Sequence, residues 1–516
     1  MTFDASRVRA TYPALADGYA YLDGAAGTQV PASVIEAIGY AYRSGIGNTG
    51  GEFPASDRSG AIVAEARRAV ADLVGGDPAG GILGPSMTAL TYRLADALSR
   101  GWVPGDEVVV SRLDHDANVR PWVQAAERSG ATVRWARVDI STTELAAAQY
   151  SALLSERTKL VAVTAASNIV GTRPDVASIA AAAHAAGALC YVDGVHATPH
   201  VPIDMRALGA DFYATSAYKW SGPHIGTVTA DPALLGKVHP DKLTPAPEEV
   251  PGRFERGTAP FADLAGVVAA VDHLAGLAPG APAAPGAPGV AKTRRERLLA
   301  SMAAVEEYEA GLFARMLGGL AAMQHVTLYG KAARRAPTAF FNVDGYTPTE
   351  AAARLAAAGV NVWNGDNYAW ELVGALGLRD RGGAIRAGLV HYNDHSDVDR
   401  LLAAVAELCL KASYHNGRGT PAGKTPGGPR GVDDAQWHLR DADRLRARPS
   451  RPRDQPFRLH RVRRDRTGRC RAGGNARAGR LGGADVPGRR GAAAAAPCVR
   501  VAGAVLACRV HPAARS

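Results

Sequence analysis

Tyr191-Val192-Asp193-Gly194-Val195-His196 indicates the fold of this chain more directly than its other segments. It contains the end of an apolar run, Ala188 to Val192, of the kind that forms a buried strand, and Asp193 stands where that strand would end. Similar runs alternate with Ala-rich helical stretches: Glu107 to Ser111, Thr132 to Arg137, Leu160 to Thr164 and Phe212 to Thr215. This alternation predicts an α/β fold with a mostly parallel sheet covered by helices on both faces.

A lone lysine follows the last of these strands, in Thr215-Ser216-Ala217-Tyr218-Lys219-Trp220-Ser221-Gly222-Pro223. Ligands bind at the carboxyl ends of strands in open α/β sheets, so Asp193 and Lys219 are expected to meet in one pocket. An acid facing a pyridine nitrogen and an amine that forms a Schiff base with an aldehyde are the groups that hold pyridoxal phosphate. The alternative is an ordinary buried acid and a solvated lysine, because both are common in α/β proteins.

Length and composition indicate a globular chain of two or three domains. The chain has 516 residues, of which 47% are hydrophobic. No run of about 18 apolar residues suggests a membrane span, and no secretory signal pattern opens the sequence. A protein of the cytoplasm without membrane contact is therefore expected. The five cysteines form no CxxC pair, which disfavours a disulfide framework or a zinc site.

The net charge of +10 arises from the C-terminal part of the chain. Residues 417–516 contain 23 Lys and Arg against 7 Asp and no Glu, which leaves about −6 for residues 1–416. Lys424 is the single lysine among 22 arginines there. This composition predicts a disordered tail, or an out-of-frame translation of a GC-rich gene. A polyanion-binding tail is a lesser alternative. A nucleic-acid partner is disfavoured, because the tail lacks a pattern of aromatic residues for base stacking.

The predicted domain organisation follows the distribution of Pro and Gly. Five parts are expected: an N-terminal segment joining the small domain (1–20), a large cofactor-binding domain (21–277), an Ala/Pro/Gly-rich loop (278–292), a small α+β domain (293–412) and the Arg-rich tail (413–516). Within the small domain, Thr293 to Leu320 reads as a long helix and Thr338 to Val343 as a strand.

Two further groups suit a phosphate and an aromatic ring. Ser86 and Met87 open a helical run, and free amides at a helix start bind phosphate; the alternative role of Ser86 is a plain helix cap. His115 follows the strand that ends at Ser111, where its ring can stack on an aromatic cofactor; the alternative is an ordinary polar loop.

Six motifs in order give a resemblance to a known family. They are Asp23-Gly24-Ala25-Ala26-Gly27-Thr28, His115-Asp116-Ala117-Asn118, Ser167-Asn168-Ile169-Val170-Gly171-Thr172, Val192-Asp193-Gly194-Val195-His196, Ser216-Ala217-Tyr218-Lys219 and Arg256-Gly257-Thr258. Over roughly residues 10 to 412 the chain resembles class V aminotransferases, and within them the cysteine desulfurase-like branch. The resemblance implies the pyridoxal phosphate transferase fold of type I.

The resemblance also implies roles for the residues that face the ring. Lys219 would bind the cofactor covalently and move a proton, and Asp193 would keep the pyridine nitrogen protonated. His115 would stack on the ring, while Asn168 and His196 would reach its hydroxyl side.

The phosphate and the substrate would be held by further residues. Ser216, Tyr218 and the amides at Ser86 and Met87 would hold the phosphate. Thr258 would approach it from the other subunit of a homodimer. The substrate carboxylate of a small amino acid would bind Arg386, because a guanidinium matches a carboxylate with two hydrogen bonds.

One departure from the desulfurase pattern concerns the reaction. The loop that carries a nucleophilic cysteine in those enzymes corresponds here to Trp363-Asn364-Gly365-Asp366-Asn367-Tyr368-Ala369, which has none. His196 also stands where many desulfurases have glutamine, and Tyr218 where many have histidine. The sequence therefore predicts a desulfurase-like or carbon-sulfur lyase reaction without persulfide transfer. An aminotransferase or an amino-acid epimerase is the alternative.

Overall fold

In the computed structural model of this chain, the described residues are 3–278 and 293–416. They fall within one structural unit that spans residues 1–423. Most of the Ala/Pro/Gly-rich loop (279–292) and most of the Arg-rich tail (417–516) lie outside the described residues, so the predictions about those two segments stay predictions.

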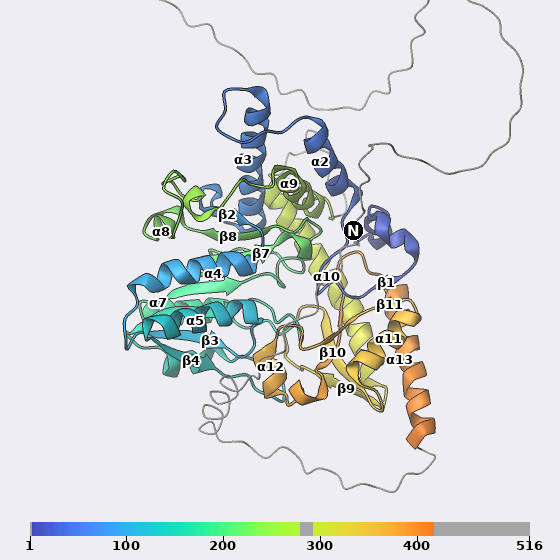
Figure 1. Ribbon diagram of the computed structural model, residues 1–516. Coiled ribbons are helices and arrows are strands. Elements are labelled where there is room, and N and C mark those ends of the chain that lie inside the picture. Colours follow the sequence, from blue (N-terminus) through green and yellow to red (C-terminus); the bar gives the residue numbers. More distant parts are fainter. Residues whose placement is uncertain (1–2, 279–292, 417–516) are drawn as a thin grey trace, which may run out of the picture. The chain divides into compact units, whose positions relative to one another are not determined.

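A seven-stranded sheet forms the larger half of the molecule (Figure 1). Its spatial order is β2 (Gly81–Gly84), β8 (Gly226–Ala230), β7 (Phe212–Ser216), β6 (Leu189–Asp193), β5 (Thr158–Thr164), β3 (Glu107–Ser111) and β4 (Thr132–Ala136). Six of these strands run in one direction, and β8 alone runs in the opposite direction between β2 and β7. The mostly parallel α/β sheet predicted from the sequence is confirmed.

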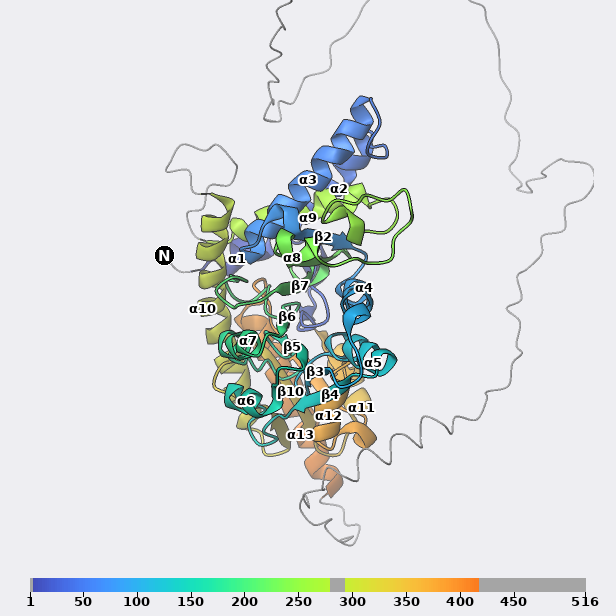
Figure 2. The same ribbon diagram turned by 90° about the vertical axis from the view of Figure 1, so that its left-hand side faces the viewer.

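Helices cover both faces of this sheet, which Figure 2 shows edge-on. One face packs against α4 (Met87–Leu98) and α5 (Arg120–Ser129), and the other against α3 (Pro54–Val74), α7 (Val176–Ala185) and α9 (Phe261–Ala275). Alternate residues of β3 show the division, since Val108 and Val110 join the first core and Val109 the second. Burial on both faces explains why these strands read as continuous apolar runs.

Two smaller sheets complete the fold. One has the order β12 (Trp363–Gly365), β13 (Ala384–Gly388), β10 (Thr338–Val343) and β9 (Val326–Tyr329), with all neighbours antiparallel. The other pairs β1 (Ala20–Tyr21) with β11 (Val360–Asn361) in parallel. The remaining helices are α1 (Ala5–Arg9), α2 (Ala32–Arg43), α6 (Tyr150–Leu153), α8 (Pro232–Gly236), α10 (Arg294–Ala321), α11 (Pro348–Ala357), α12 (Trp370–Ala375) and α13 (His395–Asn416).

Helix α10 contributes to two hydrophobic cores. Leu298, Met302 and Val305 in its first half join the core beneath the large sheet, whereas Leu312 and Met316 pack with the small sheet. A capping box between Thr293 and Glu296 fixes its start. One continuous helix therefore packs against both halves of the molecule.

The N-terminal segment also contacts both halves. Arg9 binds Asp397 of α13 with two hydrogen bonds, of 2.7 and 3.2 Å, and Tyr12 lies 2.8 Å from Ser221 beyond β7. Asp397 additionally accepts from Asn393 at 3.0 Å. The segment thus fastens the start of α13 to the strand ends of the large sheet.

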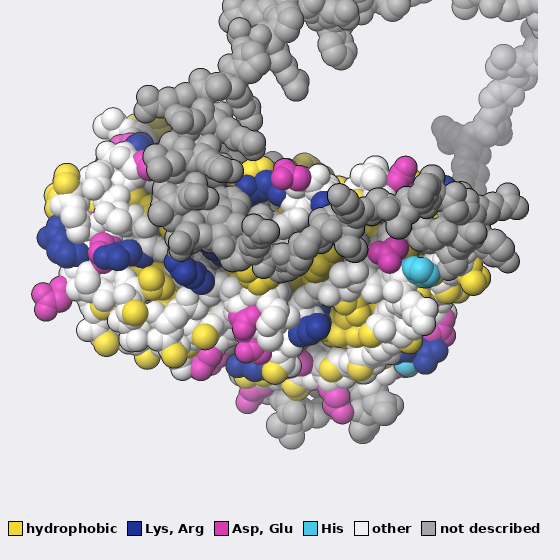
Figure 3. Space-filling model, turned by 90° about the horizontal axis from the view of Figure 1, so that it is seen from below, with side chains coloured by type: hydrophobic (Ala, Val, Ile, Leu, Met, Phe, Trp, Pro, Cys, Tyr) yellow, Lys and Arg dark blue, Asp and Glu magenta, His cyan; other side chains and the backbone are white. Residues whose placement is uncertain are grey.

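Charged side chains of both signs are interspersed on the face of the molecule seen in Figure 3. Many surface pairs are in contact, such as Arg315 with Asp399 at 2.6 Å and Lys411 with Glu407 at 2.6 Å. No described helix is both long and apolar enough to cross a membrane.

Replacing Asp397 with alanine should lower the free energy of unfolding by about 2–4 kcal/mol, because it leaves Arg9 and Asn393 without their buried partner. Urea unfolding followed by circular dichroism measures this. Asp399→Ala on the same helix is the matched control. Its half-exposed ion pair with Arg315 should contribute less than about 1 kcal/mol. Equal losses in the two variants would contradict the fastening role.

Candidate active site

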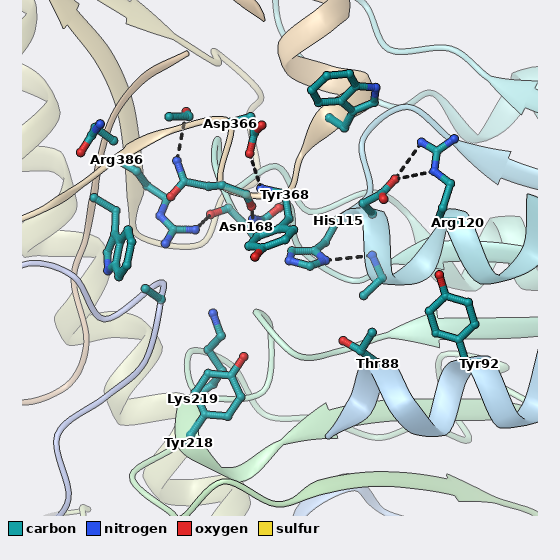
Figure 4. A pocket seen from close by; sticks show the side chains of 18 residues that line it. Thr88, Tyr92, His115, Arg120, Asn168, Tyr218, Lys219, Asp366, Tyr368 and Arg386 are labelled. Carbon is teal, nitrogen blue, oxygen red and sulfur yellow. Dashed lines mark hydrogen bonds and ion pairs between the residues drawn. The ribbon is translucent and has the colours of Figure 1, made fainter. Parts of the chain in front are cut away.

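Two adjoining cavities lie at the carboxyl ends of β6 and β7. The outer one has a volume of about 1040 Å³ and the inner one about 50 Å³. Both are bordered by Thr88, His115, Asn168, Tyr218 and Lys219 (Figure 4). The predicted convergence on the strand ends is therefore what the tertiary structure shows, with Asp193 bordering the inner cavity.

Lys219 ends a short 3-10 turn, Ala217–Lys219, directly after β7. Its side chain is only 8% exposed, and the Nζ amine donates a hydrogen bond to the carbonyl of Ala25. Thr28 holds the same turn, since its amide donates to the Tyr218 carbonyl at 2.8 Å. The first glycine-rich motif therefore forms the wall against which the lysine is held.

The electrostatic environment keeps the Lys219 amine close to neutrality at physiological pH. Burial and, to a lesser extent, the Arg386 charge lower its pKa to about 7, while Asp193 partly opposes both. An exposed lysine amine has a pKa of about 10.4. The structure thus provides a lysine that is a nucleophile near pH 7.

Asp193 is the last residue of β6 and is 3% exposed. Its Oδ1 accepts a hydrogen bond from the Val195 amide at 2.9 Å. Burial raises its pKa to about 6, against the effects of that amide and of Lys219. A cationic partner in the inner cavity would stabilise the carboxylate, because opposite charge favours the ionised form.

His115 is held in one tautomer at the mouth of the inner cavity. Its Nδ1 accepts from the Ala117 amide at 3.0 Å, so the neutral ring carries its hydrogen on Nε2. Burial, with Lys219 and Arg386 adding to it, lowers its pKa to about 3. The ring stacks on Tyr368, with centroids 5.4 Å apart and planes at 25°. A neutral, oriented ring of this kind can cover an aromatic cofactor.

Unpaired polar atoms flank the inner cavity. Asn168 Oδ1 and His196 Nδ1 are buried without a hydrogen-bond partner among the described residues. Their other atoms are engaged: Asn168 Nδ2 donates to the Asn367 carbonyl at 2.8 Å, and His196 Nε2 lies 2.9 Å from Thr338 Oγ1. Buried polar groups are normally paired, so these atoms indicate a polar ligand.

The start of α4 forms one end of the inner cavity. Ser86 is its N-cap, because its hydroxyl accepts from the Ala89 amide at 3.1 Å, and the Met87 amide donates to Ser216 Oγ at 3.4 Å. Gly226 allows this approach, since a Cβ there would lie 2.1 Å from the Ser86 carbonyl carbon. Met87 and Ser216 border the inner cavity at the start of α4, where the amides and the positive end of the helix dipole form a cradle for an anion. The capping role of Ser86 is thus compatible with such a site.

Arg386 reaches the outer cavity from the middle of β13. It is 4% exposed, and its Nη1 donates to the Asn168 carbonyl at 3.1 Å. Burial lowers its pKa to about 10, while Asp23 and Tyr218 oppose this change. Its position across the cavity from Lys219 suits a carboxylate next to a reacting amine (Figure 4).

The segment 363–369 borders the outer cavity and contains no cysteine; the structure shows that it is not a loop throughout, because Trp363–Gly365 pair with β13 as strand β12. Asn367 and Tyr368 adopt φ values of +50° and +60°, which non-glycine residues rarely adopt. The Tyr368 carbonyl accepts from the Asp116 amide at 2.7 Å, which helps to hold the loop over His115. The cysteines among the described residues, Cys190 and Cys409, are both buried and border neither of the two cavities.

Several bordering residues were not singled out from the sequence. Thr88 and Tyr92 lie one turn apart on the first turns of α4, and this spacing was the available signal. Arg120 was missed because one of its two partners is distant in sequence: it binds Asp116, four residues away, at 2.8 Å, and Glu371 at 2.6 Å. Thr258, which was predicted, is exposed and borders neither of the two cavities in this single chain.

Comparisons with known proteins agree with this architecture. The family model for aminotransferase class V matches residues 20–401. The chain belongs to the class V aminotransferase family. It is 37% identical to the uncharacterized protein MT3887 of Mycobacterium tuberculosis, over 79% of this chain and 100% of that protein. It is 32% identical to a cysteine desulfurase of Enterobacter sp. strain 638, over 79% of this chain and 99% of that protein.

A solved structure gives the same result. The cysteine desulfurase CsdA (S-sulfonic acid) from Escherichia coli superposes with a TM-score of 0.69 at 27% identity, covering 80% of this chain and 99% of that one. This class V chain is therefore a pyridoxal phosphate-dependent enzyme of fold type I, in the cysteine desulfurase-like branch. The unpaired atoms and the amide cradle described above fit that cofactor.

The lowered pKa of Lys219 is directly testable. Competitive labelling of the cofactor-free protein with acetic anhydride, read by mass spectrometry, should show Lys219 becoming reactive as the pH rises through about 7, because only the neutral amine attacks. Exposed lysines should respond about three units higher. A Lys219 profile that coincides with theirs would show that its amine is hydrated and unperturbed.

Proposed function

We propose that this enzyme acts on cysteine or a cysteine-derived amino acid in a desulfurase-like or carbon-sulfur lyase reaction that does not pass through an enzyme persulfide. The observation that carries the proposal is the cysteine-free segment 363–369 beside the outer cavity, in a chain otherwise similar to cysteine desulfurases. Bound pyridoxal phosphate supplies an electron sink for bonds at the substrate Cα.

The chain's own residues would divide the work at the ring. Lys219 would hold the cofactor covalently and, once released, take the proton from Cα, which its lowered pKa permits near pH 7. Asp193 would hold the pyridine nitrogen in its cationic form through an opposite charge. His115 would cover the ring, and Asn168 and His196 would lie on its hydroxyl side, where the unpaired His196 Nδ1 would donate to the ring oxygen.

The phosphate and the substrate would lie on opposite sides of Lys219. Ser216, Tyr218 and the amides at Ser86 and Met87 would hold the phosphate, where the α4 dipole favours negative charge. Arg386 would bind the substrate carboxylate with two hydrogen bonds and so orient the Cα bonds relative to the lysine.

In the lyase reaction the Cα–H and Cβ–S bonds of cysteine break. The proton goes to Lys219, the sulfur leaves as hydrosulfide, and water then releases ammonia and pyruvate. No second thiol is needed to accept sulfur, which agrees with the composition of the loop. A desulfurase-like outcome would instead yield alanine and pass sulfur to an external thiol. The cytoplasmic location predicted from the sequence belongs to the same proposal.

The purified enzyme, incubated with a panel of amino acids and their thioethers, should release sulfide from cysteine together with pyruvate or alanine. Colorimetric sulfide detection and mass spectrometry of the products measure this. Lys219→Ala should remove the yellow absorbance and the activity, and Asp193→Asn should retain cofactor but lose most turnover.

Keto-acid-dependent loss of amine, or racemised amino acid without sulfide, would replace the lyase proposal with the aminotransferase or epimerase alternative. Both alternatives use the same cofactor site, and both reactions are compatible with the match to the aminotransferase class V family. An Arg386→Ala enzyme whose amino-acid affinity is unchanged would contradict the carboxylate role.

A homodimer is the second part of the proposal. Thr258 is exposed and borders neither cavity of its own chain, which suits a residue that reaches the phosphate of a partner subunit. The site would then be complete only in the dimer.

Subunit mixing tests this arrangement. Inactive Lys219→Ala and Thr258→Tyr proteins, unfolded and refolded together, should regain up to about a quarter of wild-type activity, because a mixed dimer has one intact site. Sedimentation equilibrium checks that dimers form. If the mixture stays inactive although mixed dimers form, Thr258 does not act across the interface.

A further inference from the structure

A series of buried polar side chains continues from His196 away from the inner cavity. His196 Nε2 lies 2.9 Å from Thr338 Oγ1, and the His196 ring meets the His200 ring edge-on with centroids 5.1 Å apart. His200 Nδ1 lies 2.8 Å from Glu309 Oε2. All four side chains are at most 3% exposed. They come from three separate segments, the turn after β6, helix α10 and the start of β10.

The pair of His200 and Glu309 fixes which nitrogen of His200 carries a hydrogen next to His196. Burial favours a pair without net charge, because an uncompensated buried ion is costly. Two such forms exist, an imidazolium with a carboxylate and a neutral imidazole with a carboxylic acid. In both forms His200 keeps a hydrogen on Nε2, since the proton shared with Glu309 lies at Nδ1. His200 is therefore a poor proton acceptor for its neighbour.

His196 is kept neutral by these surroundings. Burial lowers its pKa well below the usual value, and His200, Lys219 and Arg386 each add to this. A neutral imidazole has one donor nitrogen and one acceptor nitrogen. The group that binds one nitrogen consequently decides what the other can do.

Thr338 contacts His196 Nε2 through its hydroxyl and can therefore set the tautomer of His196. Its amide donates to the Ala336 carbonyl at 2.7 Å, and its carbonyl accepts from Arg335 at 2.9 Å, so its backbone is fully engaged. The hydroxyl has His196 as its described partner. When the hydroxyl donates to Nε2, the imidazole hydrogen lies on Nδ1, the atom left without a partner.

We propose that Thr338 and the pair of His200 and Glu309 are positioning residues that hold His196 as the neutral tautomer with its hydrogen on Nδ1. His196 then donates a hydrogen bond to the ring oxygen of pyridoxal phosphate. This inference rests on the proposed cofactor-facing role of His196. It explains how a histidine can act as a fixed donor at a position where an amide side chain would need no tautomer control.

The test is the pH dependence of the visible absorbance of the cofactor-loaded protein. Thr338→Val removes the hydroxyl with little change in volume, so His196 loses its tautomer control. Without the donor, the negative ring oxygen holds the neighbouring proton more tightly, and the absorbance midpoint should move to higher pH by roughly one unit. Thr338→Ser keeps the hydroxyl and should restore the wild-type midpoint.

Two further variants separate this role from a merely structural one. Thr229→Val changes another fully buried strand threonine, in β8, and should leave the midpoint in place. The Thr229 hydroxyl has no hydrogen-bond partner among the described residues. Glu309→Gln should move the midpoint in the same direction as Thr338→Val but by less, because His200 is then no longer held with its hydrogen on Nε2.

Three outcomes overturn the inference. An unchanged midpoint in Thr338→Val, or equal shifts in the Val and Ser variants, excludes tautomer control by Thr338. An unchanged midpoint in Glu309→Gln excludes the role of the buried pair. A wild-type protein that shows no cofactor absorbance in the visible range overturns this inference and the proposed cofactor site together, which distinguishes the two failures.

Discussion

The burial of one lysine amine is the constraint on which the rest of this structure depends. Lys219 is placed beyond β7 with its Nζ against the Ala25 carbonyl, and it is almost fully removed from water. Burial costs the charged form of an amine more than the neutral form, so a large share of the amine is neutral and reactive near pH 7. The ionisable groups nearby must therefore be compatible with an amine that is either neutral or charged near pH 7.

The surrounding groups meet this requirement in different ways. His115 and His196 are kept neutral by burial and by the neighbouring positive charges, so each offers a fixed hydrogen-bonding pattern. Burial raises the pKa of Asp193 to about 6, and a neighbouring cation would favour its ionised form. The pocket therefore suits a bound group that carries both positive and negative parts.

The second half of the chain acts on this pocket through β10, β12 and β13. β13 supplies Arg386, β10 supplies Thr338, and the loop after β12 places Tyr368 on His115. The same loop lacks the cysteine that would accept sulfur. The outer cavity is thus bordered by residues from both parts of the chain, with Lys219 from the large sheet and Arg386 from β13.

Sequence patterns located the strands of the large sheet to within about two residues at each end, and they showed the order of the cofactor motifs. The strands at Glu107–Ser111 and Thr338–Val343 were predicted with their observed limits, because continuous apolar runs and β-branched residues mark buried strands. Asp193 and Lys219 were predicted to share a pocket because parallel strands end at one edge of a sheet. The tertiary structure alone decided which distant residues join them. Arg120 with Glu371, and His200 with Glu309, are pairs more than a hundred residues apart whose burial and charge balance exist only after packing.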